Sequence, residues 1–156
     1  MPAPVLTLTD DLISKLATAT GYTFTRRISP FLKREQIIGG KWIAIAAGDE
    51  QAIEAREVDR TTLTIDIAYQ EPLPDKSDLQ PDPLENKTWF DAVMAKIENV
   101  KNQFRGDGDL RQTAYAGGFQ FSTMTNTPIY HPDLMMDFQI FTAVIRFEFT
   151  GEITAT

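Results

Sequence analysis

The chain has 156 residues and a formal net charge of −7, and 42% of its residues are hydrophobic and 24% charged. This length predicts a single domain over residues 1–156, and the composition excludes disordered and fibrous proteins. The absence of cysteine excludes disulfide frameworks, thiolate-bound zinc, iron–sulfur clusters and cysteine nucleophiles. The acidic excess argues against a protein that binds DNA with its whole surface, because phosphate contacts need clustered Lys and Arg.

The beginning of the chain predicts a helix followed by a strand. Leu12 and Leu16 recur at helical spacing after Thr9, which is a suitable N-cap, and Gly21 can end the helix. Residues 22–26 then alternate apolar with polar side chains, as a half-buried strand does. No segment resembles a secretory signal or a membrane span, so we expect a soluble protein that is not secreted.

Two further strands are expected before the middle of the chain. Residues 41–47 form a nearly continuous apolar run, which is typical of a strand covered on both faces and placed at the centre of a sheet. Residues 48–61 are polar and charged and are expected to form a loop. Residues 62–69 alternate cleanly, which predicts a strand with one buried face.

The remaining elements are a loop, a helix and two strands. Residues 71–87 are rich in Pro and Asp and predict an exposed loop, and residues 89–104 form an amphipathic helix. A weak strand is expected around residues 119–121 and a strong one over 138–149, followed by a flexible tail at 151–156. This order predicts an α/β (α+β) fold, with a mixed, largely antiparallel β-sheet and helices packed mainly on one face.

Few residues are suited to catalysis. His131 is the single histidine and is expected to be an ordinary loop residue, since Pro132 restricts its backbone. Neither a nucleophile elbow nor a phosphate-binding loop is present, and the segment 106–109 lacks the later acidic ligands of a calcium loop. The acidic clusters lie in predicted loops and are expected to be solvated. We therefore expect no enzyme activity, no catalytic, cofactor-binding or metal-binding residues, and no cofactor.

The charge is distributed unevenly along the chain. Residues 26–41 contain five basic residues and one acidic residue, whereas residues 49–59 contain five acidic residues and one basic residue. Ordinary surface patterning explains such a distribution, and so does a head-to-tail contact between copies that closes into a ring. In the second interpretation, the subunit interface includes Arg26, Arg27, Lys33, Arg34, Asp49, Glu50, Glu54 and Arg56.

Several segments carry a combination of strand and loop patterns that resembles a known family. They are FTRRISPF (24–31), WIAIAA (42–47), the charged GDEQAIEAR (48–56), TIDIAYQ (64–70), IYHPDL (129–134) and FQIFTAVIRF (138–147). Together they resemble the tail terminator family (minor tail protein U-like) of long-tailed bacteriophages, prophages and gene transfer agents. The chain departs from that pattern in its long Pro/Asp-rich loop and after Gly151.

The resemblance implies an α/β structural protein that assembles as a ring, typically a hexamer, at the head-proximal end of the virion tail. Such a ring caps the tail tube, stops its polymerisation and joins it to the head–tail connector or neck protein. DNA passes through the lumen without sequence-specific binding, and assembly takes place in the bacterial host cytoplasm without a membrane. A head-completion or neck protein of the same particle, and a small-ligand-binding α/β domain, remain the alternatives.

Overall fold

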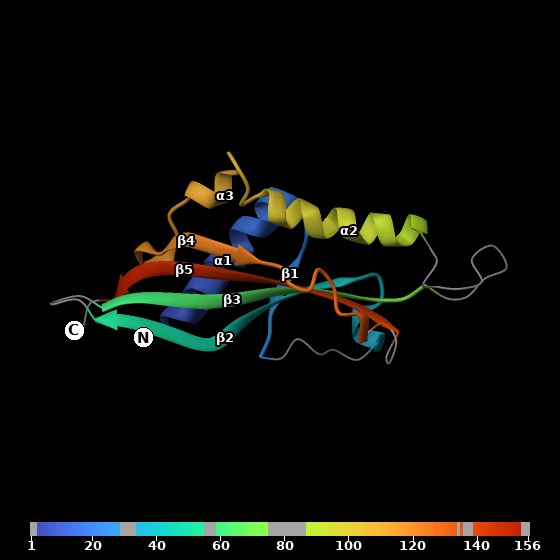
Figure 1. The fold of residues 1–156 in the computed structure, drawn as a ribbon, viewed down its shortest axis with the longest axis horizontal. Coiled ribbons are helices and arrows are strands. Elements are labelled where there is room, and N and C mark those ends of the chain that lie inside the picture. Colours follow the sequence, from blue (N-terminus) through green and yellow to red (C-terminus); the bar gives the residue numbers. More distant parts are fainter. Residues whose placement is uncertain are drawn as a thin grey trace.

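A computed structural model describes residues 3–28, 34–54, 59–74, 87–133, 135 and 139–153. One long helix lies at the start of the chain and a second in the middle, and strands follow each of them (Figure 1). In chain order they are α1 (Pro4–Thr20), β1 (Phe24–Arg26), the 3-10 turn η1 (Arg34–Ile37), β2 (Lys41–Glu54), β3 (Asp59–Pro72), α2 (Lys87–Asn102), α3 (Asp109–Gln112), the 3-10 turn η3 (Ala116–Gly118), β4 (Gln120–Thr125) and β5 (Ile140–Ile153).

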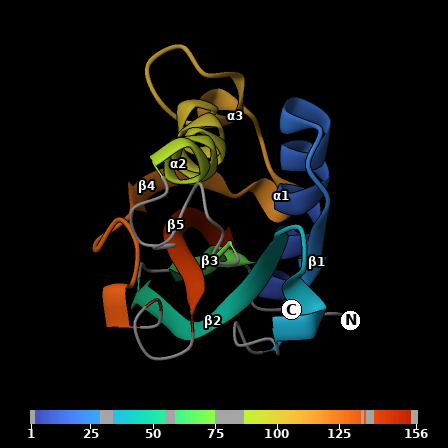
Figure 2. The same ribbon diagram turned by 90° about the vertical axis from the view of Figure 1, so that its right-hand side faces the viewer.

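The strands form a five-stranded sheet in the order β1-β2-β3-β5-β4. The short β1 pairs parallel with the beginning of β2, and the other neighbours pair antiparallel. Helices α1 and α2 lie on the same face of this sheet (Figures 1 and 2). The predicted fold class is therefore confirmed: the fold is α+β, with a mixed, mostly antiparallel sheet and helices packed against one face.

The main core lies between this sheet face and the two long helices. Alternate residues of β3 and β5 point toward the helices and are buried, as the period of two in both segments predicts. Aromatic rings fill much of the space, for example Phe104 and Phe147, whose centroids are 4.6 Å apart. The buried residues of these elements are Leu8, Leu12, Leu16, Leu63, Ile65, Ile67, Tyr69, Val93, Ile97, Val100, Phe141, Ala143, Ile145, Phe147 and Phe149.

The opposite face of the sheet is more polar. Ile37 of η1 covers Ile43 of β2 in a small second cluster. Farther along, Arg146 makes a two-pronged ion pair with Asp66 on the neighbouring strand, with N–O distances of 2.9 and 3.0 Å. The second face therefore combines one small apolar patch with exposed charged side chains.

Helix α1 begins earlier than its sequence pattern predicts. It begins at Pro4, which suits the first turn of a helix because proline lacks the N–H that would be unpaired there. Thr9 is not the N-cap. It is fully buried within the helix, and its hydroxyl donates to the Val5 carbonyl oxygen at 2.6 Å. The expected cap residue is thus a core residue whose polar group is satisfied locally.

Strand β2 is twice as long as predicted, and the expected loop at 48–61 is wrong over most of its length. β2 continues to Glu54 and β3 already begins at Asp59, with a register irregularity between Ala46 and Glu50. The poor strand formers in this part are held by backbone pairing with β3, which overrides their low intrinsic preference. The centre of the sheet is β3 and not residues 41–47, because β3 has β2 and β5 as full-length neighbours.

The boundaries of the Pro/Asp-rich loop and of the tail also change. Pro72 belongs to β3 and Leu73 is buried, so the predicted loop at 71–87 is wrong at its first residues. Its last residue, Lys87, begins α2, and residues 75–86 lie outside the described residues. The predicted tail is likewise shorter, because β5 pairs with β3 as far as Ile153. Residues 154–156 are not among those described.

Candidate subunit interface

The basic residues predicted for the interface lie near the beginning of β2. Arg26 ends β1 and is exposed, and its guanidinium donates to an Asp10 carboxylate oxygen at 2.9 Å and to the Leu6 carbonyl oxygen. Part of its charge is therefore already balanced within the subunit. Arg27 follows, and its backbone N–H donates to the Ala44 carbonyl oxygen at 2.9 Å.

The remaining basic residues of the prediction are partly outside the described part of the chain. Arg34 begins η1, and Lys41 is the first residue of β2. Lys33 and Arg56 are not among the described residues. The structure thus brings Arg26, Arg27 and Arg34 to elements that pack near the start of β2.

The acidic residues of the prediction lie in the second half of β2. Glu50 pairs in register with Leu63, and Glu54 pairs with Asp59 at the end of the hairpin. Asp49 lies within the irregular stretch just before Glu50. These positions belong to a strand and not to the expected loop, so the backbone of the acidic segment is fixed by the sheet.

The acidic segment lies farther along β2 than the basic segment, at the edge of the sheet that β1 and β2 form. Arg26 pairs with Ala44 and Lys41 begins β2, whereas Glu50 and Glu54 lie in the second half of the strand. Glu50 and Glu54 pair with residues of β3 that are seven and eleven positions from the partner of Lys41, which is roughly 23–36 Å at about 3.3 Å per residue. Basic and acidic positions are therefore separated along one edge of the sheet.

A pocket near the beginning of β2 was not expected from the sequence. It has a volume of about 490 Å³ and is lined by residues that include Tyr22, Trp42, Tyr69 and the two cations Lys41 and Lys96. The rings of Tyr22 and Trp42 are stacked, with centroids 5.6 Å apart. The aromatic residues looked like core residues in sequence because their spacing in the strands is that of buried positions.

One residue that lines this pocket, Tyr69, has a hydroxyl group with a shifted pKa. Lys96 Nζ donates to the Tyr69 hydroxyl oxygen at 3.2 Å. Burial raises the pKa of Tyr69 well above its usual value, and the nearby Glu71 carboxylate raises it further. Tyr69 therefore stays protonated at physiological pH and serves as a hydrogen-bonding group rather than as an anion.

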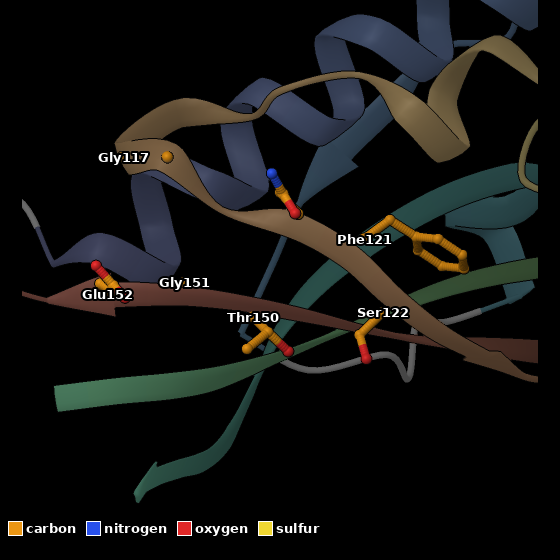
Figure 3. A pocket seen from close by; sticks show the side chains of 8 residues that line it. Gly117, Phe121, Ser122, Thr150, Gly151 and Glu152 are labelled. Atoms are coloured by element: carbon orange, nitrogen blue, oxygen red, sulfur yellow. The ribbon is translucent and has the colours of Figure 1, made fainter. Parts of the chain in front are cut away.

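A second pocket lies at the other edge of the sheet, beside β4 and the end of β5 (Figure 3). Its volume is about 550 Å³, and its lining is mostly polar and glycine-rich. Figure 3 shows Ser122 on β4 and Thr150 on β5, with Gly151 and Glu152 continuing β5; Thr150 pairs with Gln120, the first residue of β4. Among the described residues that line it there is no basic side chain.

The structure describes His131 and the segment 106–109, which were considered above for catalysis and for calcium binding. The backbone N–H of His131 donates to the Thr142 carbonyl oxygen at 2.8 Å, which ties its loop to β5. The segment 106–109 connects α2 to the short α3. In the part of the chain that the structure describes, no group of three or more His, Cys, Asp or Glu side chains is placed to hold a metal ion.

Neither a comparison with protein-family models nor one with curated proteins finds a match to this chain. Among the helices of the described residues, none is both long enough and apolar enough to span a membrane.

Proposed function

We propose that this protein is a structural virion protein, the subunit of a tail terminator ring. The ring caps the tail tube, stops its polymerisation and joins the tail to the head connector. The proposal starts from the similarity of the strand and loop patterns to the tail terminator family, and a small α+β subunit with an extended sheet is compatible with it.

The observation that carries the proposal is the polarity of β2. Basic residues gather near its beginning, and acidic residues lie in its second half, roughly 23–36 Å from Lys41 at about 3.3 Å per residue. A ring between a tube and a connector needs subunits whose two ends differ, because each end meets a different partner. A head-to-tail contact between copies likewise needs two unlike surfaces on each subunit.

The direct test of the function is the tail length of particles that lack the protein. If the ring stops polymerisation, particles without it have abnormally long tails in electron micrographs. A neck protein gives a different result, because its loss leaves tails of normal length that are not joined to heads. Normal tails correctly joined to heads would contradict both assignments.

The charged residues are tested by reversal. Arg34→Glu and Glu54→Lys are each expected to reduce the ring fraction several-fold in light scattering at low salt. High salt should shrink the difference, because exposed charges are screened. Arg111→Glu is the matched control, since Arg111 is exposed on α3 outside both charged segments. Intact rings from both variants would contradict the charged contact but not the ring.

The pocket beside Trp42 favours a second candidate, a small-ligand-binding domain. Its aromatic wall and its two lysines suit a small planar anion. In that case the purified protein is a compact monomer, and an aromatic carboxylate such as benzoate raises its melting temperature further as the logarithm of its concentration increases. Lys96→Met should abolish that rise. Annular particles with no such rise would exclude this candidate.

A further inference from the structure

The second half of β2 has an unpaired edge. β1 covers β2 only from Trp42 to Ala44, and no other described strand lies on that side. From Ile45 onward, the strand pairs with β3 on one side alone. No described strand pairs with its outward backbone N–H and C=O groups, and such an edge can accept another strand.

The opposite edge of the sheet is β4, which has no second neighbour among the described strands. Its sequence QFSTMT contains no charged residue and no proline; Phe121 and Met124 are half-buried, and the other four side chains are exposed. Natural proteins usually guard an exposed edge with Lys, Pro or an inward-pointing charge. An edge without these features suits regular pairing with another strand.

The two free edges lie at the same level of the sheet. Ile45 is connected through Asp66 and Arg146 to Thr125, which is the last residue of β4. In the same way, Gln51 is connected through Thr62 and Thr150 to Gln120, which is the first residue of β4. The open part of β2 at this level thus has the same extent as the whole of β4.

The irregular positions of the two edges also lie close together. The register shift of β2 (Ala46 to Glu50) lies opposite Thr64 of β3, and that of β4 (Phe121 to Thr123) lies between the levels of Leu63 and Thr64. The extra residues, two in β2 and one in β4, are therefore at neighbouring levels. This proximity lets the two edges follow each other along most of their length.

The directions of the strands agree as well. β3 runs opposite to β2, β5 runs opposite to β3, and β4 runs opposite to β5. β4 is thus antiparallel to β2. A rotation about an axis roughly along the strands keeps these directions, so β4 of one copy would meet β2 of the next copy antiparallel, the more common and slightly more stable arrangement.

We propose that neighbouring copies associate by pairing β4 of one copy with residues 45–51 of β2 of the next, which continues the sheet from subunit to subunit. The inference deepens the proposed ring and rests on it. The contact is heterologous, because it joins two different edges, and it can therefore close around a rotation axis. It uses backbone groups and does not require the basic and acidic segments of neighbouring copies to touch.

Engineered disulfides test this pairing, and a chain without cysteine gives a clean background. Facing residues of antiparallel strands have Cα atoms about 4.5–5.5 Å apart, which a disulfide can bridge. Gln51→Cys with Gln120→Cys, and separately Ile45→Cys with Thr125→Cys, are expected to give a ladder of covalent multimers after oxidation with diamide. The ladder should end at the ring number on a non-reducing gel.

The control combines the same two edges in the wrong register. Gln51→Cys with Thr125→Cys places the thiols at opposite ends of the paired segment and should give at least tenfold less multimer. A melting curve of each variant under reducing conditions verifies folding, and the second matched pair replaces the first if one variant unfolds.

The outcomes separate the pairing from the proposed function. Rings in electron micrographs without cross-links in either matched pair would overturn the strand pairing and leave the terminator ring intact. Dimers from Gln51→Cys alone, with no ladder, would show that the β2 edge pairs with itself and would also overturn it. Ladders together with normal tail length in particles lacking the protein would support the pairing and contradict the terminator function.

Discussion

The two halves of β2 are stabilised in different ways. From Lys41 to Ala44 the strand lies between β1 and β3, and Trp42 is 4% exposed and contacts three aromatic rings. From Ile45 to Glu54 it has β3 on one side only among the described strands, and its sequence is charged and small. The first half is specified by side-chain burial and the second by backbone pairing.

The comparison shows that two parts of one strand can be held in the extended conformation by different interactions. Side-chain packing makes the first half of β2 a fixed part of the core. Backbone pairing with β3 keeps the second half extended. A strand of this kind can present charge in a rigid arrangement, which a loop cannot.

The largest expected effect on the free energy of unfolding comes from truncating Trp42, in the half of β2 that lies between β1 and β3. Trp42→Ala removes the stack with Tyr22 and the contacts with Phe24 and Tyr69. It should lower the free energy of unfolding by about 3–5 kcal/mol. Thr25→Ala on the neighbouring β1 is exposed and should change it by less than about 0.5 kcal/mol. Urea titrations of both variants provide the measurement, and equal losses would refute the contrast.

Substitutions at the two glycines just before β2 are expected to have an intermediate effect on the free energy of unfolding. Gly39 and Gly40 both have positive φ, +80° and +89°, so alanine at either costs about 1–2 kcal/mol in backbone strain. A Cβ at Gly40 would also overlap the Tyr69 hydroxyl, whereas one at Gly39 meets nothing within 4 Å. Thermal unfolding should therefore show Gly40→Ala to be less stable than Gly39→Ala by a further ~1–3 kcal/mol.

The smallest effect on the free energy of unfolding is expected at the level of Ile45, where β1 no longer pairs with β2. Ile45 lies at the level of the Asp66–Arg146 ion pair, whose Arg146 side chain is 48% exposed. A double-mutant cycle with Asp66→Asn and Arg146→Gln should give a coupling below about 1 kcal/mol. Repeating the cycle at high salt should reduce that coupling. A coupling of several kcal/mol would mean that side chains also stabilise this part of the sheet strongly.

Buried periodic segments could be predicted from the sequence, and segments held only by pairing could not. The apolar alternation around Ile65 and Ile145 predicted both long strands correctly, because burial of one face leaves its period in the sequence. The second half of β2 leaves no such period. Its Asp, Glu, Gly and Ala residues suit a loop, and only the partner strand β3 determines their conformation.

The candidate site follows the same rule. The charge segregation between residues 26–41 and 49–59 was visible in sequence, but the placement of Asp49, Glu50 and Glu54 on a strand that continues from Lys41 was not. The free edges of β2 and β4 could not be predicted either, because an edge is defined by which strands are neighbours and not by its own residues.

The order of strands also governs how the chain acquires its structure. β3 is the centre of the sheet, yet one of its two neighbours, β5, follows at a separation of 80 residues between Asp66 and Arg146. Such distant pairing makes the closure of the sheet a slow step, since a long chain segment must be ordered before any contact forms. During synthesis, the backbone edge of β3 that pairs with β5 stays open until β5 has been made, and an open strand edge is prone to aggregation.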